Sequence, residues 1–464
     1  MRLKDEQAVF KPRLNLGFPF DVFTGRWYEG VNGESILNGG LGGFTGIGGP
    51  PNMHKSSLAH FFNLIINSRI NHCSGMVYDT ETTFSPERFN DFMHNIRGFE
   101  DKDVETLVEE GKLSFYDRIG YFGEHWYSDL RKEMTKKALD KKSYITLPFV
   151  NKITGELVKI PPIDVVEMDS MTEFTIEGLE NKRENVELGH KDLNMEAMDE
   201  MKAKSHMVRK FPSASVLSST FIIATAHVGE EHKLDPYAVT PKKLMYLKGN
   251  AKFKRVPNQF NFLPMDVYYI YGMETMKNSS TKGVEYPSKR YEDFKDNPDL
   301  QKIYVYNTRG KGGPTGVPMA IMVSQAEGIL VGLTAFEYCK KDSKFGIGGN
   351  DRNYYMELYP EVTLSRTTIR DIITEDPRLQ TALHFTAELN AFHKGIAKVD
   401  RDLLCTPKEL YDDLKTLGYD WNVLLDTRQH YVPLEEEKLQ TQPFLSTKDL
   451  LRMRKELYRP KWLK

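Results

Sequence analysis

The sequence predicts an α/β protein whose mainly parallel central sheet is covered by helices on both faces. Apolar segments of strand length at residues 74–79, 163–169 and 220–227 alternate with segments that have helical spacing. Such alternation is typical of parallel strands joined by helices. The 464 residues, with 40% hydrophobic and 28% charged side chains, can bury a large core, and a net charge of −2 excludes a general basic excess.

Other elements extend this pattern along the chain. Helices are predicted at residues 57–66, 86–98, 121–142 and 193–210, and further strands at 265–271, 302–306 and 318–323. The Gly-rich segment 309–316 indicates an antiparallel extension at one sheet edge. We expect an N-terminal arm with few regular elements (1–38), a core (39–329) with an insertion (98–159), and a mostly helical C-terminal subdomain (330–464).

The cysteines and the hydropathy of the sequence indicate in which cellular compartment the protein is expected. Cys73, Cys339 and Cys405 are far apart and form no Cys-x-x-Cys pair, which argues against a disulfide framework or a structural zinc site. No apolar run approaches the ~18 residues that a membrane span requires, and the first residues lack a hydrophobic signal segment. We therefore expect a cytoplasmic protein without a membrane partner.

Residues 49–56, Gly-Pro-Pro-Asn-Met-His-Lys-Ser, match a phosphate-binding loop with one departure. In the standard pattern G-x-x-x-x-G-K-[ST], backbone amides surround phosphates, the lysine reaches the β- and γ-phosphates and the hydroxyl binds Mg²⁺. Here His54 replaces the second glycine, while Lys55 and Ser56 are kept. The alternative is a Gly/Pro-rich loop that simply leads into a core helix. The residues expected to bind ATP are Gly49, Pro50, Pro51, Asn52, Met53, His54, Lys55, Ser56 and Ser57.

Polar residues follow the ends of three predicted strands. Asp79 and Glu81 end the first, Asp169 ends the second and His227 ends the third. Because ligands of parallel sheets bind at the carboxyl ends of strands, these residues should face the same crevice as Lys55. There Glu81 could activate water, Asp169 could hold Mg²⁺ with Ser56, and His227 could sense the γ-phosphate. The alternatives are a helix cap for the two acids, an ordinary turn after Asp169 and a satisfied polar group for His227.

Taken in order, these segments resemble the RecA/UvsX family of recombinases, most closely its phage UvsX branch. Members of that branch also carry a bulky residue at the position of His54, and residues 78–86 look like the family's Asp-x-Glu motif. The resemblance spans about residues 39–328, with a longer than usual spacing between Glu81 and Asp169. It implies a RecA-like P-loop ATPase core, with Glu81 as the catalytic glutamate and His227 at the sensor position.

In this family the loop after the sensor strand contacts single-stranded DNA, and here it corresponds to residues 229–262. Aromatic side chains are interleaved with basic ones in this segment. The aromatic rings could stack on bases, and the basic groups could neutralise phosphates. A solvated basic loop is the alternative. The residues expected to bind DNA are Lys233, Lys242, Lys243, Lys248, Lys252, Lys254 and Arg255.

Family members also form helical filaments in which a neighbour completes the ATP site. Arg309 and Lys311 occupy the place where such trans-acting catalytic residues are expected, or else they are ordinary cations of a Gly-rich hairpin. The arm, residues 1–38, would pack on the adjacent protomer. The implied partners are single-stranded DNA, homologous duplex DNA, further copies of the chain, and candidate single-strand-binding and mediator proteins.

Two other functions fit parts of the same pattern. A hexameric replicative helicase shares the core and the sensor position but forms closed rings. A nucleotide-binding scaffold that has lost hydrolysis would account for His54 and the long insertion.

Overall fold

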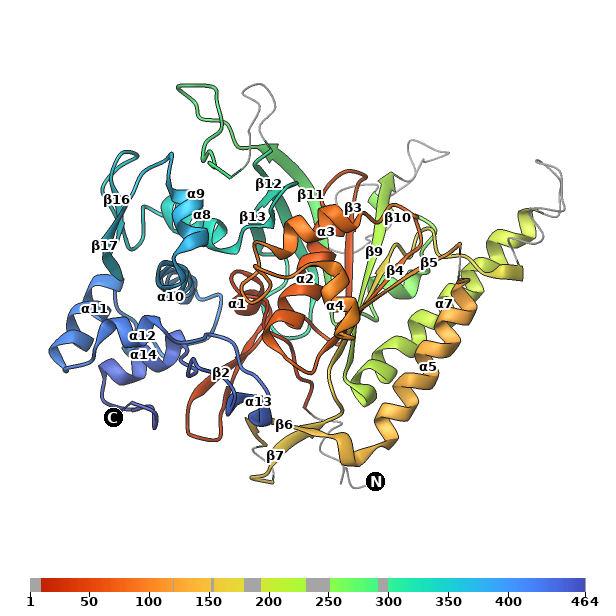
Figure 1. Cartoon of the computed structure of the whole chain (residues 1–464), viewed down its shortest axis with the longest axis horizontal. Helices are drawn as coiled ribbons and strands as arrows, with labels where there is room; N and C mark the ends of the chain where they lie inside the picture. Colours follow the sequence, from red (N-terminus) through yellow and green to blue (C-terminus); the bar gives the residue numbers. More distant parts are fainter. Residues whose placement is uncertain are drawn as a thin grey trace, which may run out of the picture.

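The computed structural model describes residues 10–119, 121–151, 154–178, 193–230, 251–290 and 299–463. Its centre is one large sheet with the strand order β14-β13-β12-β11-β3-β9-β8-β4-β5, to which β10 adds by pairing with β9 (Figure 1). The six strands from β11 to β5 run parallel to their neighbours in this order. Strands β12, β13 and β14 pair antiparallel, as predicted for one edge. The predicted α/β class with a mainly parallel sheet is therefore confirmed.

The strands lie close to their predicted positions. The parallel strands are β3 (Phe44–Gly49), β4 (Ser74–Asp79), β5 (Leu113–Asp117), β8 (Asp164–Asp169), β9 (Thr220–Glu230) and β11 (Asp266–Thr275). The antiparallel strands are β10 (Ala251–Phe253), β12 (Gln301–Gly310), β13 (Pro318–Ser324) and β14 (Gly328–Ile329).

Strand β3 was not predicted, because its sequence Phe-Thr-Gly-Ile-Gly-Gly reads as a Gly-rich approach to the loop. Its glycines make room for aromatic rings. A Cβ on Gly46 would lie 2.8 Å from the ring of Phe260, and one on Gly48 would lie 2.2 Å from the ring of Phe253. The small residues of the central strand are thus a packing requirement, since two phenylalanines fill the space where side chains would stand.

We expect Gly48→Ala to destabilise the protein by about 1–3 kcal/mol, because the added methyl group overpacks the contact with Phe253. Chemical denaturation measures this change. Gly272→Ala is the matched control, since Gly272 also lies in a central strand and its Cβ would meet Tyr304 only at 3.6 Å. Equal stability of the two variants would show that the close approach at Gly48 is not limiting.

Helices cover both faces of the sheet because the strands are apolar on both sides. On one face, Leu58 and Phe62 of α2 (Lys55–Arg69) pack in the same core as Ile223 of β9. On the other, Trp126 of α5 (Gly123–Leu139) and Phe211 of α7 (Leu193–Ser218) join a second core. Neighbouring residues of a strand point to opposite faces, which divides β9 between the two cores. Further helices described in this half are α3 (Pro86–Met93) and α4 (Val104–Glu109), with the short η2 (Lys141–Ser143) and η3 (Asn258–Asn261).

The segment expected to be an insertion, residues 98–159, contributes to the central sheet. It supplies the edge strand β5 and helix α5, which packs along α7 (Figure 1). It then forms the hairpin of β6 (Ile145–Val150) and β7 (Leu157–Ile160), whose last residue lies just beyond this range.

The N-terminal segment differs from the expected arm. Residues 10–38 include α1 (Phe20–Thr24), β1 (Arg26–Glu29) and β2 (Ser35–Asn38), and they pack on their own chain. Leu16, Phe18 and Phe20 are buried, and Arg13 forms an ion pair of 2.6 Å with Asp266. Apolar side chains of this size gain about 1.5–3 kcal/mol each on burial, which favours packing within the protomer. Residues 1–9 lie outside the described residues.

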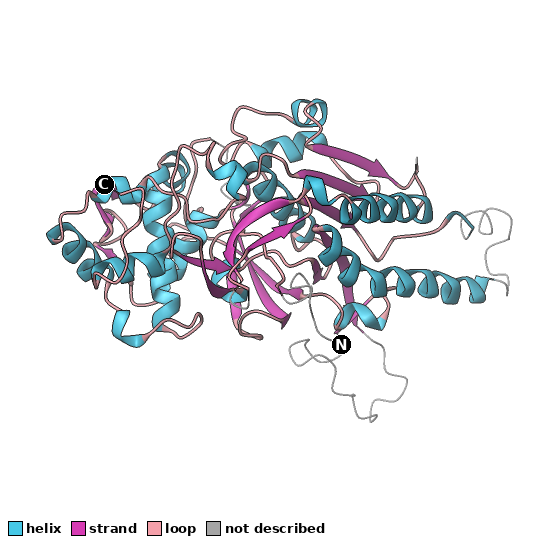
Figure 2. Cartoon of the chain, turned by 90° about the horizontal axis from the view of Figure 1, so that it is seen from below, coloured by secondary structure: helices cyan, strands magenta, loops and turns pink. Residues whose placement is uncertain are grey.

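The C-terminal region is mostly helical, as predicted, and forms the end of the molecule away from α5 and α7 (Figure 2). Helix α10 is buried along most of its length and packs on α8. The helices are α8 (Val331–Lys341), α9 (Ile369–Glu375), α10 (Pro377–His393), η4 (Arg401–Leu403), α11 (Pro407–Thr416), α12 (Trp421–Leu425), α13 (Leu434–Glu437) and α14 (Thr447–Arg454). A small sheet contains β15 (Ile347–Gly348), β16 (Tyr354–Met356) and β17 (Tyr359–Leu364). Among the described helices, none has the length and apolar character needed to cross a bilayer.

Candidate nucleotide site

The expected site residues gather at the carboxyl ends of the parallel strands. Gly49 at the end of β3 is level with His227 of β9, and Asp79 of β4 is level with Asp169 of β8. The loop after Gly49 leads directly into α2, whose first residue is Lys55. Chain order and strand register thus bring the loop, the acids and the histidine to one edge of the sheet.

The N-terminus of α2 has the features of an anion site. Its cap residue His54 has φ 55° and ψ 29°, the left-handed conformation that glycine adopts most easily and that histidine tolerates better than most side chains. No side chain caps the first turn and no acid lies in it. Its amides are therefore available to phosphate oxygens. The Lys55 ammonium donates to the Pro50 carbonyl at 2.8 Å, a bond it can exchange for a phosphate.

The side chain of His54 turns away from the loop. Its Nε2 lies 2.7 Å from Oε1 of Gln301 at the start of β12, and its Nδ1 lies 3.3 Å from the Ser57 hydroxyl. Burial lowers the pKa of His54 below its ordinary value, and the charge of Arg88 acts in the same direction. His54 therefore fits the loop as a neutral side chain at pH 7.

Glu81 and His227 form a pair beside this loop. His227 Nε2 lies 2.9 Å from Glu81 Oε1, and both side chains are partly exposed. The hydrogen bond from His227 lowers the pKa of Glu81 against the effect of burial, and Ser170 and Lys55 lower it further. Glu81 is thus a carboxylate at neutral pH, which a general base must be.

Asp79, unlike Glu81, is bonded to the backbone of the loop that follows it. Its two carboxylate oxygens accept from the backbone amides of four successive residues, Glu81, Thr82, Thr83 and Phe84, at 2.7–2.8 Å. The expectation that Asp79 also points at the crevice is therefore corrected: it orders the loop that presents Glu81. Ser85, with its side chain accepting from Arg88, caps α3.

Asp169 lies on the adjacent strand. Its Oδ1 accepts from the Thr225 hydroxyl, and a cis peptide bond joins it to Ser170. Burial lowers the pKa of Lys55, while the charges of Asp169 and Glu81 oppose this effect. The charges of Lys55 and the two acids thus interact with one another.

Within the described ranges no group of three His, Cys, Asp or Glu side chains could hold a metal alone. Of the expected metal ligands, Ser56 follows Lys55 in the first turn of α2 and Asp169 ends β8, and their hydroxyl and carboxylate oxygens are of the hard kind that Mg²⁺ prefers.

A buried ion pair beneath the site explains an oddity of the sequence, the acid Glu167 inside an apolar strand. His60 of α2 lies 2.6 Å from Glu167, which is fully buried in β8. Burial opposes the charge of His60, but the Glu167 carboxylate raises its pKa overall. The pair ties the helix that follows the loop to the strand that carries Asp169. A lone His in an apolar helix and a lone Glu in an apolar strand were the signals of this contact.

Arg309 and Lys311 do not join the site of their own chain. Strand β12 runs antiparallel to β11, so it starts at Gln301, near His54 and the carboxyl ends of the parallel strands. Its last residues lie at the amino ends of those strands. There Arg309 donates to the Pro264 carbonyl at 2.9 Å. Burial lowers the pKa of Lys311, and the nearby Arg309 adds to that effect.

The basic segment after His227 is only partly within the described residues. Lys233, Lys242, Lys243 and Lys248 lie outside them. Lys252 belongs to β10, which pairs antiparallel with the end of β9, and Lys254 and Arg255 follow it. The segment was expected to be a loop, but β10 and the end of β9 pair as antiparallel strands. The amide of Lys254 donates to the His227 carbonyl at 2.9 Å.

No protein-family model matches the chain, and no curated protein matches it. Among solved structures, the chain is similar to the crystal structure of the RadB recombinase. The superposition has a TM-score of 0.34 and 14% sequence identity, and it covers 63% of this chain and 92% of that chain.

Several parts of the site could not be recognised from the sequence. Gln301 contacts His54 from 247 residues away, and the Asp169 partner Thr225 lies within an apolar strand. Neither residue stands in a recognisable motif. Both contacts arise from the strand order, which places β9 beside β8 and the start of β12 near the loop.

Proposed function

We propose that this chain is an ATP-dependent DNA recombinase of the RecA/UvsX type, which assembles on single-stranded DNA and promotes pairing and strand exchange. The observation that supports this most directly is the contact between Glu81 and His227, 2.9 Å apart at the sheet edge that also carries Lys55. It joins a candidate catalytic carboxylate to the strand that leads into the basic hairpin.

In this proposal the loop residues 49–57 surround the phosphates of ATP and Lys55 contacts the β- and γ-phosphates. Mg²⁺, when bound by Ser56 and Asp169, supplies positive charge that neutralises the phosphates. Glu81 accepts the proton of the water that attacks the γ-phosphate, and Asp79 holds the Glu81 loop in position.

His227 links the two functions through its backbone and its side chain. The imidazole contacts Glu81, while the main-chain carbonyl accepts from Lys254 and the main-chain amide donates to the Thr172 hydroxyl at 2.9 Å. A change at Glu81 on loss of the γ-phosphate would thus reach the β9–β10 hairpin through one residue. The DNA contacts proposed here are the basic residues of the hairpin and its connecting segment, Lys233, Lys242, Lys243, Lys248, Lys252, Lys254 and Arg255.

Arg309 and Lys311 are proposed to act in trans. Their place at the far sheet edge prevents them from reaching their own phosphate loop, but a neighbour in a filament could bring them to it. A positive charge supplied across an interface would couple hydrolysis to assembly. The described part of the expected arm is engaged with its own chain, so protomer contacts must use other surfaces or residues 1–9.

The pH profile of ATP turnover tests whether His54 only fits the loop. Because burial lowers the pKa of His54 below 6.5, the side chain is neutral in the folded protein at pH 7. The free energy of unfolding therefore decreases through this residue only as the pH falls through 6.5, where the unfolded chain takes up a proton more readily. We expect wild type and His54→Phe to show the same profile between pH 7 and 9. A step near neutral pH in the wild type alone would show that His54 titrates there.

ATP turnover with and without single-stranded DNA separates the recombinase from a passive scaffold. We expect DNA to stimulate phosphate release by the wild-type chain, because the hairpin begins at His227. Turnover that is absent under both conditions would favour the scaffold. A hexameric helicase would also be stimulated by DNA, and electron microscopy distinguishes its closed rings from filaments.

A further inference from the structure

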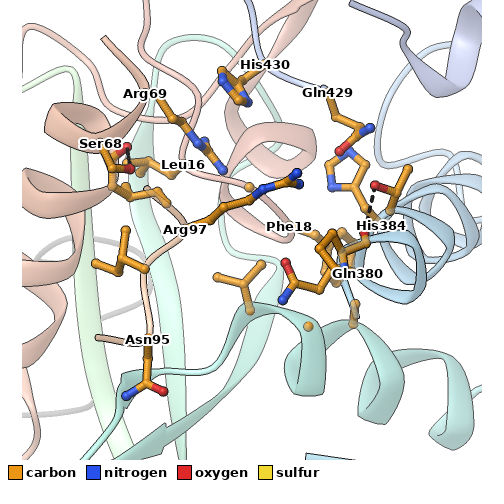
Figure 3. A pocket seen from close by; sticks show the side chains of 18 of the residues that line it. Leu16, Phe18, Ser68, Arg69, Asn95, Arg97, Gln380, His384, Gln429 and His430 are labelled. Atoms are coloured by element: carbon orange, nitrogen blue, oxygen red, sulfur yellow. Dashed lines mark hydrogen bonds between the residues drawn. The ribbon is translucent and has the colours of Figure 1, made fainter. Parts of the chain in front are cut away.

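A cavity of about 350 Å³ lies at the junction of the core and the C-terminal region, remote from the phosphate loop. It is bordered by the end of α2, the segment after α3, the N-terminal segment, helices α8 to α10 and the loop before and after α13 (Figure 3). Arg69 marks its distance from the nucleotide site, because it is the last residue of the helix that Lys55 begins. Fifteen helical residues separate the two ends by about 20 Å.

The charge of the cavity wall has one sign. Four arginines and two histidines line it, and none of its lining residues is an aspartate or glutamate. The six cationic or titratable residues are Arg69, Arg97, Arg370, Arg428, His384 and His430. Figure 3 shows the Arg97 guanidinium in the middle of the space, between Arg69 and His384. A wall of this kind attracts anions.

Some of these charges are neutralised from behind the wall. Arg370 pairs with Glu327, Arg428 lies 2.6 Å from Glu437, and His384 lies 3.4 Å from Glu388. These acids hold the cationic side chains in fixed positions. Buried charges need such partners, so the three contacts alone would be structural.

Arg97 lacks a comparable partner, whereas the buried Asp21 partly offsets the charge of Arg69. Among the described residues, none lies within ion-pair distance of Arg97, which is largely exposed. The nearby Asp426 senses the charge of Arg97, but it is already bonded to Arg378 by two hydrogen bonds of 2.7 Å. Arg69 donates to the main-chain carbonyl of Asn15 at 2.5 Å. Positive charge is therefore left over at the cavity.

His430, one of the two histidines at the cavity, is affected by this excess of positive charge. Burial lowers the pKa of His430 well below its ordinary value, and the charges of Arg69, Arg428 and Arg97 lower it further. A bound anion would counter these charges and raise the pKa of His430. This residue is thus an internal reporter of occupancy.

We propose that the cavity is a binding site for a small phosphorylated anion, distinct from the nucleotide site. Arg97 and Arg69 contact its phosphoryl oxygens, since guanidinium groups match the planar, bidentate geometry of phosphate. The volume is at the lower end of ligand pockets, which suits a small molecule and excludes a polymer chain. Apolar side chains such as Leu16, Phe18 and Ile96 could face an organic group on the ligand.

Titration calorimetry with inorganic tripolyphosphate tests the site. The full chain carries Lys55→Ala, so that binding at the phosphate loop is weakened in every sample. We expect saturable binding with one ligand per chain, and Arg97→Ala in this background should reduce the affinity by at least about tenfold. Arg352→Ala is the matched control, because Arg352 is exposed and does not line the cavity. Absence of binding, or equal loss in both arginine variants, would overturn the proposal.

NMR of the histidine rings gives a second readout that does not depend on affinity. The His430 signal, assigned with a His430→Gln variant, should titrate at higher pH when tripolyphosphate is present. An unchanged His430 titration under saturating ligand would place the anion elsewhere.

Two sources of the phosphoryl group can be told apart in the same experiment. Tighter binding of AMP than of tripolyphosphate would assign an organic phosphate, and the reverse order would assign an inorganic polyphosphate. Competition by a short oligonucleotide at this site would contradict the proposal, because it would make the cavity part of a nucleic-acid surface. None of these results depends on ATP turnover, so this proposal can fail or hold independently of the proposed function.

Discussion

Replacing Lys55 by alanine is expected to abolish ATP turnover, with a loss of at least roughly 10²–10³-fold. The Lys55 ammonium interacts with the charges of both Asp169 and Glu81, and it donates a hydrogen bond to the Pro50 carbonyl. Without it, the transferring phosphoryl group loses the positive charge that Lys55 supplies in the proposed site. Phosphate release from the purified variant measures the effect.

Lys142→Ala is the control for this substitution, since Lys142 is exposed in a short helix away from the site. Both variants should melt at the temperature of the wild type. Unchanged ATP turnover in Lys55→Ala would contradict the proposed nucleotide site as a whole, because the roles proposed for the other residues depend on a phosphate held at this position.

The Glu81→Gln variant is expected to bind nucleotide but to hydrolyse it about 10²–10⁴-fold more slowly. Glutamine keeps the shape and can still accept the hydrogen bond from His227, but it cannot take a proton from water. Because the pKa of Glu81 is lowered by His227, the wild-type group is ready as a base at neutral pH. Nucleotide binding by calorimetry and turnover by phosphate release are measured on the same preparation.

Glu87→Gln is the matched control, because Glu87 is an exposed acid in the same segment and contacts Ser85 instead of the site. It should leave both binding and turnover unchanged. Loss of nucleotide binding in Glu81→Gln would instead assign Glu81 a structural role.

The spacing of apolar residues in the sequence predicts most of the strands and helices, and the elements that it does not predict have physical reasons. Strands β4, β8 and β9 were located within a few residues, because their apolar runs end in polar residues. Strand β3 was missed since its glycines conceal a strand whose side-chain space is filled by Phe253 and Phe260. The N-terminal segment resembles an arm in the sequence because its elements are short, although its buried phenylalanines belong to the same core as α2.

The site was predictable to the extent that it follows strand ends. Lys55, Glu81, Asp169 and His227 do meet at one edge, because chain order and a parallel sheet leave them no other place. The separate task of Asp79 was hidden, since only the loop geometry shows four amides directed at its carboxylate. The cationic cavity was equally hidden, because its arginines come from four distant segments of the chain.

Electron microscopy of the wild-type chain with ATP and single-stranded DNA tests the central claim most directly. The recombinase account predicts open helical filaments along the DNA, with Arg309 and Lys311 of one protomer facing the phosphate loop of the next. Closed six-membered rings would contradict it in favour of a helicase, and bare DNA beside free protein would contradict any assembly on nucleic acid.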